Sequence, residues 1–315
     1  MARNGCGAPN YIAARLDMVA LLGEKTVWCS FMPSVTLVVC VHRQRDLLER
    51  LIRESAGCYD ELIVLHDIPD IQNVREVTLA AGGRFFEREP IFLQEPHWPF
   101  AWGEAKHDWI LRLDTDEFPS PELKKWLQEF RRAPEPASEI SGYFCIWPMW
   151  DGQRAISKKW PANRLFLFHK QRVRFFGMCE QSPVPDGQCK ALDLVLCHQP
   201  KRKSYGIYNT VFRRQSQLGA KYIAHCLLGK PTDLVCWRWS NPQWPVQWEQ
   251  IRRHPILTAA NRLLMETLRG IRDQWRKERK IYPFIALNGP IYHALFALQF
   301  WWLRTFKHND STPPE

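Results

Sequence analysis

The first third of the chain alternates short apolar runs with segments of helical periodicity, and this alternation restricts the fold more than any other feature of the sequence. The runs at 35–41, 61–66 and 109–113 are mainly apolar and are bounded by turn residues, as buried strands are. Between them, 45–56 and 74–81 carry apolar residues at helical spacing and end at glycines. This order of strands and helices predicts an α/β fold with a parallel sheet and right-handed crossovers.

The pattern changes after position 120, where the sequence predicts a less regular second half. Residues 121–132 have the spacing of a short amphipathic helix, and a Pro-rich and Ser-containing loop follows. The segments 143–150 and 164–176 are typical of antiparallel strands. We therefore expect a mostly parallel sheet with a mixed second half.

Length and cysteine content bound the organisation of the chain. Its 315 residues suit one large domain with an appendage, which we expect at 32–245 and 246–315, respectively. Residues 1–31 lack sustained periodicity, so we expect a poorly ordered extension there, with Met32 as a hypothetical natural start. The ten cysteines include no C-x-x-C pair, which argues against a zinc ribbon and indicates reduced thiols in a cytoplasmic protein.

The stretch WILRLDTDEFPSPEL at 109–123 places three carboxylates directly after an apolar run. Asp114, Asp116 and Glu117 repel one another unless something cationic lies between them. Parallel sheets bind ligands at the carboxyl ends of their strands, and Asp67 also follows a predicted strand. A magnesium ion takes one or two carboxylates and completes its shell with water and phosphate oxygens. The sequence therefore predicts a metal site at this edge, with a solvated acidic turn as the alternative.

The passage VTLVVCVHR … DELIVLHD … DWILRLDTDEFPSPEL resembles the GT-A-fold family 2 glycosyltransferases over roughly 33–205. The resemblance implies a GT-A (Rossmann-like) fold, a nucleotide-sugar donor and a divalent metal, Mn or Mg. It also implies that Asp67 contacts the nucleotide base and that Asp116 binds the metal directly. Asp114 would hold the ribose or share the metal, and Glu117 would either orient its neighbours or act as a ligand.

A later segment, NRLFLFHKQRVRFFGMCEQSPVPDG at 163–187, resembles lipopolysaccharide-core-type members of that family. In those members the segment ends in a His-Glu pair, where this chain has Cys179 and Glu180. An inverting transferase needs a carboxylate to take the proton of the acceptor hydroxyl, which contributes on the order of 10²–10⁴ in rate. We expect Glu180 to be this general base, with Asp186 in reserve; a salt bridge with a nearby arginine is the alternative role for Glu180.

The segment LCHQPKRKSYG follows a predicted apolar strand and combines a histidine with a basic cluster. His198 matches the late histidine of the family, which completes the metal shell or touches the diphosphate; a buried core histidine is the alternative. Lys201, Arg202, Lys203 and Tyr205 suit a pyrophosphate, because Arg and Lys bind phosphate oxygens. A solvated loop is the alternative for this cluster.

The C-terminal region joins a basic segment to an apolar one. Residues 250–280 hold nine Lys and Arg against three acidic residues, whereas 281–303 carry no formal charge. We expect Pro283 and the turn at 288–290 to break the apolar segment, leaving a piece too short to span a bilayer. Together with a chain net charge of +10, this pattern favours a peripheral tail on an anionic membrane surface over a helix docked on the domain.

These features predict an inverting, metal-dependent glycosyltransferase that moves a sugar from a nucleotide sugar to a lipid-linked or lipopolysaccharide-core-type glycan acceptor. We expect it to be cytoplasmic and peripheral on the inner face of the cell membrane, without nucleic acid as a partner. An inactive transferase that only binds nucleotide sugar and membrane remains open, since Cys179 replaces a family histidine. A membrane- or nucleic-acid-binding module would leave the acidic strand ends unexplained. A haloacid-dehalogenase-like phosphatase is disfavoured by Phe118, where that motif has Thr or Val.

Overall fold

The computed structural model defines which parts of the chain can be described. These are residues 32–42, 44–66, 70, 72–88, 94–175, 182–200, 219–220, 223–224, 227–228 and 246–306. All of them belong to one compact unit, Met32–Glu315. The extension predicted at 1–31 lies outside the described residues.

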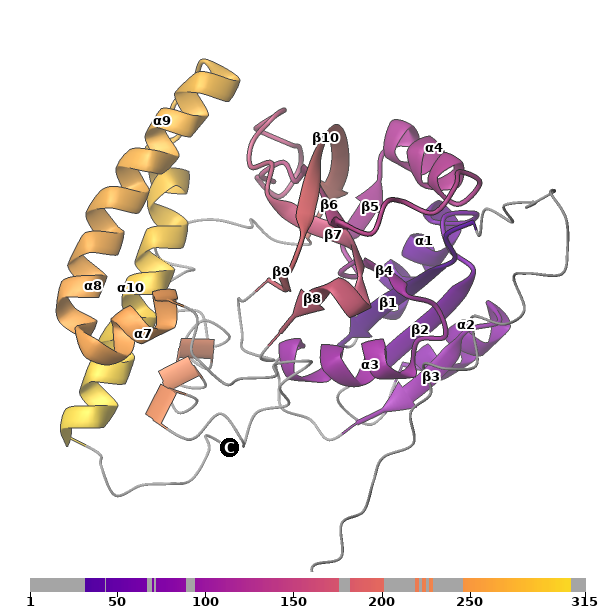
Figure 1. Cartoon of the computed structure of the whole chain (residues 1–315), viewed down its shortest axis with the longest axis horizontal. Helices are drawn as coiled ribbons and strands as arrows, with labels where there is room; N and C mark the ends of the chain where they lie inside the picture. Colours follow the sequence, from indigo (N-terminus) through magenta and orange to yellow (C-terminus); the bar gives the residue numbers. More distant parts are fainter. Residues whose placement is uncertain are drawn as a thin grey trace, which may run out of the picture. The chain divides into compact units, whose positions relative to one another are not determined.

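Within the described ranges, eight strands form one mixed sheet in the order β3-β2-β1-β4-β7-β6-β10-β5 (Figure 1). Strands β3, β2, β1 and β4 run parallel, β7 runs antiparallel to both β4 and β6, and β10 is parallel to β6. The α/β fold with a largely parallel first half and a mixed second half is therefore confirmed. The strands are β1 (Val35–Val41), β2 (Glu61–His66), β3 (Arg84–Glu87), β4 (Trp109–Arg112), β5 (Glu117–Pro119), β6 (Ile140–Ile146), β7 (Arg164–His169) and β10 (Gln188–His198).

Helices cover the sheet and bury apolar side chains against both of its faces. They are α1 (Arg45–Glu54), α2 (Val74–Ala80), α3 (Trp98–Glu104) and α4 (Pro121–Phe130). Leu37 and Val39 of β1 belong to a core cluster with α1 and α4, whereas Val38 belongs to a second cluster with α3. A strand buried on both faces favours apolar residues at nearly every position, which is why β1 is apolar except at Thr36, whose hydroxyl donates a hydrogen bond to Glu61.

The break at Pro-Ser-Pro after the acidic cluster has a local structural cause. The Ser120 side chain caps α4 by accepting a hydrogen bond from the Leu123 backbone N–H at 3.2 Å. Pro121 occupies the first helical position, where its missing N–H costs nothing. Between the cluster and this cap lies β5, which pairs antiparallel with the end of β10. This short strand was not predicted, because three residues carry too little periodicity to reveal a strand.

The C-terminal region consists of packed helices with their own apolar core. They are α7 (Val246–Arg253), α8 (Pro255–Asn261), the π-helical segment η5 (Arg262–Glu266), α9 (Thr267–Glu278) and α10 (Pro283–Phe306). Helix α10 packs on α7, α8, η5 and α9. Phe296 and Phe300 of α10 are buried in this core together with Trp248 and Ile251. In the described ranges, none of the helices combines the length and apolar character needed to cross a membrane.

Of the two predicted breaks in the apolar segment, the one at Pro283 is confirmed, because α10 begins there, and the one at 288–290 is wrong, because α10 runs without interruption through Pro290. A proline inside a helix costs about 3 kcal/mol or more. Each large apolar side chain that α10 buries stabilises the protein by about 1.5–3 kcal/mol, so the packing outweighs that cost. The neighbouring helix also approaches closely, since a Cβ added at Gly270 would lie only 3.6 Å from the Cβ of Ala286. One face of the predicted tail is therefore docked on other helices.

Candidate functional site

The sheet topology brings residues at the ends of four strands to one edge. Asp114 and Asp116 follow the carboxyl end of β4, and Arg164 opens β7, which runs antiparallel to β4. His198 closes β10, where it pairs with Glu117 of β5. In addition, the Gln199 backbone N–H donates to the Asp116 carbonyl at 2.8 Å. The acidic turn and the end of β10 are thus held together by backbone hydrogen bonds.

Glu117 is buried completely, and the protein satisfies both of its carboxylate oxygens. Its Oε2 accepts hydrogen bonds from the Asp114 backbone N–H at 2.8 Å and from Arg164 Nη2 at 2.7 Å. Its Oε1 accepts a hydrogen bond from Trp147 Nε1 at 2.6 Å. A carboxylate with these partners has little capacity left for a ligand. The geometry therefore favours orientation of its neighbours as the role of Glu117.

Arg164 supplies the cation that the clustered carboxylates require. Besides its bond to Glu117, its Nη2 lies 3.0 Å from Asp114 Oδ2. Burial acts to lower the pKa of Arg164, but Glu117 and Asp114 raise it above the ordinary value, so the guanidinium stays charged. This arginine belongs to the segment 163–187 that carries the family resemblance, but no role was assigned to it from the sequence. Three carboxylates in four positions were the available signal for a buried cation nearby.

Asp116 differs from its two acidic neighbours because Arg164 does not bind it. Burial, followed by the charges of Asp114 and Glu117, raises the pKa of Asp116 to about 7. A second cation close to this carboxylate would stabilise its charged form. Asp116 is therefore the member of the cluster that is most available for a positively charged ligand.

His198 lies beside Asp116, with Nε2 at 3.7 Å from Asp116 Oδ2. Burial lowers the pKa of His198 to about 3, so its imidazole is neutral near pH 7 and keeps a lone pair. The ring stacks on Trp147 at a centroid distance of 3.9 Å and an interplanar angle of 20°. Its Nδ1 is buried and has no hydrogen-bond partner among the described residues. Trp147 thus fixes both His198 and Glu117, a role that sequence reasoning did not assign to it.

The donor atoms at this edge fit a divalent cation that shares its shell with a ligand. Asp116 offers a carboxylate oxygen and His198 a neutral nitrogen, both of which are common metal ligands. Over the described part of the chain, no three His, Cys, Asp or Glu side chains form a group that could hold a metal by themselves. The remaining ligands would come from water and from phosphate oxygens of a bound nucleotide.

Arg112 is a second buried cation near this edge. It closes β4, and its guanidinium lies 4.2 Å from the ring centroid of Trp98. Burial and the charge of Arg164 lower the pKa of Arg112 to about 10, which leaves it protonated at neutral pH. Its Nε and Nη1 find no hydrogen-bond partner within the described ranges. The edge therefore carries two buried guanidinium groups, neither of which the sequence analysis included in the site.

Several of the predicted site residues lie outside the described residues. They are Asp67, Glu180, Lys201, Arg202, Lys203 and Tyr205. The reserve base Asp186 is described: it is exposed and forms an ion pair with Arg174 at 2.5 Å. The structure thus brings together Asp114, Asp116 and His198 among the predicted residues.

Comparisons with known proteins give structural similarities only. No family model matches this sequence, and no curated protein matches it either. The mannosyltransferase PcManGT from Pyrobaculum calidifontis, in complex with GDP-Man and Mn2+, is similar with a TM-score of 0.46 and 11% identity over 86% of this chain and 88% of that one. S. aureus TarS in complex with UDP gives a TM-score of 0.35 and 11% identity over 86% and 91%. The glycosyltransferase GlyE of Streptococcus pneumoniae gives 0.27 and 12% over 44% and 34%. All three TM-scores are below 0.5, and the strand order of the sheet is what defines the fold.

Proposed function

We propose that this protein is an inverting glycosyltransferase that uses a nucleotide sugar and a divalent metal, Mn or Mg. The observation that carries the proposal is the pair Asp116 and His198 at the carboxyl edge of the sheet. Asp116 lacks the cationic partner that its neighbours have, and His198 presents a neutral imidazole 3.7 Å away. Such a pair suits a metal-bound diphosphate better than it suits a solvated turn.

In this proposal the residues at the edge divide into ligands and supports. Asp116 and His198 hold the cation, and Asp114 holds the ribose or shares the metal. When bound, the cation neutralises the charge that builds up on the departing nucleoside diphosphate. Arg164 and Trp147 keep the acidic turn and the imidazole in position through their contacts with Glu117 and His198.

The remaining roles follow from the resemblance to family 2 transferases. Asp67 contacts the nucleotide base, and Glu180 takes the proton of the acceptor hydroxyl during an inverting displacement. Lys201, Arg202, Lys203 and Tyr205 bind the diphosphate.

The proposed acceptor is a lipid-linked or lipopolysaccharide-core-type glycan, with the enzyme bound peripherally at the cytoplasmic face of the membrane. Residues 32–245 would form the catalytic domain and 246–315 the membrane-associating region, with 1–31 as an extension. Exposed apolar and basic side chains on the C-terminal helices support this arrangement.

Calorimetric binding of UDP and GDP, with and without Mn, tests the proposal. Wild type should bind one of the two nucleotides in a metal-dependent manner, and Asp116→Asn should lose this binding. Asp193→Asn is the matched control, because Asp193 is an exposed carboxylate on β10. If neither nucleotide binds under any condition, the proposal fails. Metal-dependent binding without sugar transfer to any glycolipid acceptor would instead support the inactive transferase, which the Cys179 substitution favours.

A further inference from the structure

The continuous helical segment formed by α8, η5 and α9 exposes a row of apolar side chains. Leu257, Leu264, Leu268 and Trp275 are 69%, 61%, 53% and 51% exposed, respectively. Leu268 and Trp275 are seven residues apart in α9, so they lie on one side of that helix, and Leu257 in α8 and Leu264 in η5 precede them along the same helical segment. We call these four residues the apolar row. Soluble proteins rarely expose large apolar side chains in such a contiguous arrangement unless a partner covers them.

The packing of the helical region leaves the apolar row free. Ala259 is buried and lies two residues from Leu257, on the opposite side of α8. Gly270 of α9 faces Ala286 of α10, which runs beside α8 and α9 in Figure 1. The apolar row therefore contributes little to the helical core, and its exposure needs another explanation.

Positive charge surrounds the apolar row. Residues 246–306 contain ten Lys and Arg against four Asp and Glu. Arg272 lies between Leu268 and Trp275, one helical turn after the former, and it is exposed. Arg269 and Arg276 are exposed as well and directly follow two members of the row. A helix with an apolar face bordered by cations has the composition of segments that lie in the interface of an anionic bilayer.

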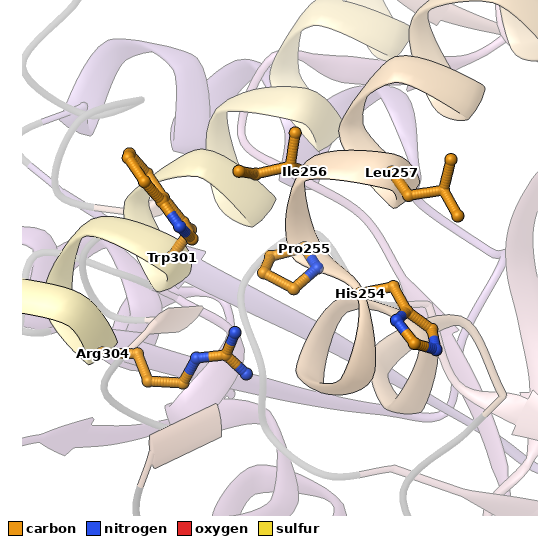
Figure 2. A pocket seen from close by; sticks show the side chains of 6 residues that line it. All are labelled: His254, Pro255, Ile256, Leu257, Trp301 and Arg304. Atoms are coloured by element: carbon orange, nitrogen blue, oxygen red, sulfur yellow. The ribbon is translucent and has the colours of Figure 1, made fainter.

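A shallow pocket joins this surface to the end of α10. It has a volume of about 260 Å³ and is lined by His254, Pro255, Ile256, Leu257, Trp301 and Arg304 (Figure 2). Its walls are apolar, with the guanidinium of Arg304 at the side, where it donates to the Arg252 carbonyl at 2.8 Å. Apolar walls beside a cation suit a phospholipid, because its acyl chain is apolar and its phosphate is an anion that can pair with the cation. Beyond the pocket, α10 exposes Trp302, and aromatic residues of this kind favour membrane interfaces.

We propose that the apolar row and the adjoining pocket form the surface that docks this protein onto an anionic membrane. This inference rests on the membrane association in the proposed function and assigns it to named residues. It differs from the sequence expectation in its apolar part: there the basic segment 250–280 supplied the charge and the apolar segment 281–303, now largely packed as α10, supplied the apolar contact. A second copy of the chain is the less favourable occupant, because it would bring two cationic surfaces together.

Vesicle co-sedimentation tests the docking surface directly. The vesicles contain phosphatidylcholine alone or equal amounts of phosphatidylcholine and phosphatidylglycerol, and the full chain is used. Wild type should bind the anionic vesicles at least about tenfold more tightly than the neutral ones, since each cation near the surface adds attraction. The double variant Leu264→Gln/Leu268→Gln should lose at least about tenfold in affinity for the anionic vesicles.

The matched control is Leu79→Gln, because Leu79 in α2 is 53% exposed, as Leu268 is. It should bind vesicles as wild type does, and circular dichroism should show that both variants remain folded. Equal vesicle binding by wild type and the double variant would overturn the proposal. So would a concentration-dependent dimer in sedimentation that the same double variant abolishes, if wild type binds no vesicles.

Nucleotide calorimetry on the same variants separates this inference from the proposed function. The double variant should bind UDP or GDP with Mn as wild type does, because none of its changes lies at the sheet edge. A loss of vesicle binding with intact nucleotide binding supports the docking surface. Vesicle binding by a protein that binds neither nucleotide would sustain the docking surface while removing the transferase.

Discussion

Glu61 and Asp116 lie at opposite edges of the central sheet, and the protein shifts the pKa values of their carboxyl groups in opposite directions. At the amino-terminal edge, Glu61 accepts hydrogen bonds from Thr36 Oγ1 and the Lys106 backbone N–H, both at 2.8 Å, and from Arg84 at 3.1 Å. Burial acts to raise the pKa of Glu61, but these partners lower it below the ordinary value. At the carboxyl-terminal edge, burial and like charges raise the pKa of Asp116 to about 7.

The difference shows that carboxylates of one sheet can serve two purposes: one stabilises the fold, and the other is suited to binding a ligand. A carboxylate whose oxygens are all bonded to its own chain fastens strands together, as Glu61 does for β1, β2 and β3. A carboxylate left among like charges lowers the stability of the empty protein and gains most from a cationic ligand. For these two residues, the hydrogen bonds that Glu61 receives and the like charges beside Asp116 distinguish the two roles.

The largest expected effect comes from removing the charge at the carboxyl-terminal edge. Asp116→Asn should weaken metal-dependent nucleotide binding by about 100-fold or more, because a direct cation ligand is lost. Its free energy of unfolding should stay equal or rise, since an uncompensated buried charge is removed. Calorimetry and thermal unfolding measure the two effects. A marked fall in melting temperature would contradict the comparison between the edges.

The opposite outcome is expected at the amino-terminal edge. Glu61→Ala should lower the free energy of unfolding by about 2–4 kcal/mol, because three buried or half-buried donors lose their acceptor. Nucleotide binding by the folded fraction should not change. Glu104→Ala is the control, because it removes only the more exposed partner of Arg84 and should cost less than about 1 kcal/mol. Chemical denaturation measures both variants, and equal costs would remove the special role of Glu61.

A smaller effect is expected from Trp147→Phe, which keeps a ring beside His198 but removes the hydrogen bond to Glu117. One oxygen of a buried carboxylate then loses its partner, which costs about 1–3 kcal/mol of unfolding free energy. Nucleotide affinity should fall by about tenfold, as is typical when a support of a metal ligand is removed. Trp126→Phe makes the same change in volume at a half-buried core position without a described hydrogen bond. If the two variants behave alike, the bond to Glu117 has no special importance.

The smallest expected effect is on the loss of stability at acidic pH. The pKa of Glu61 is lower in the folded protein than in the unfolded chain, so its contribution to stability is present above the unfolded value, about 4.3. That contribution is lost as the pH falls through the lower folded value. Glu61→Gln should therefore lose less stability than wild type on acidification. Denaturant unfolding at a series of pH values checks this, and parallel curves would contradict it.

The elements that the sequence predicted well are those whose signal is local. The strands β1, β2 and β4 are mainly apolar runs, and α1 has leucines at helical spacing, so their neighbours in sequence reveal them. By contrast, β5 exists because the distant strand β10 pairs with it. The helix through Pro290 persists because distant side chains pack on it.

The residues of the candidate site also fall into two groups, those with a signal in the sequence and those without one. The acidic turn was recognisable because three carboxylates directly follow a strand, and His198 was selected through a family resemblance. The functions of Arg164 and Trp147 depend on how β7 and the segment after β6 return to the edge of β4. Their positions depend on tertiary packing between distant segments, so no pattern within either segment indicates them. A buried cation could be expected near the carboxylates, but the sequence did not identify which one.

The pairing of β5 with β10 has a consequence for the thermodynamics of ligand binding. Because the Gln199 N–H is bonded to the Asp116 carbonyl and Glu117 pairs with His198, two of the predicted ligands are already fixed before anything binds. A flexible site would lose conformational entropy when a ligand orders it, and that loss would reduce the affinity. Here the ordering has been completed during folding. The heat capacity and entropy of nucleotide binding should therefore reflect released water and displaced protons more than a freezing of the chain.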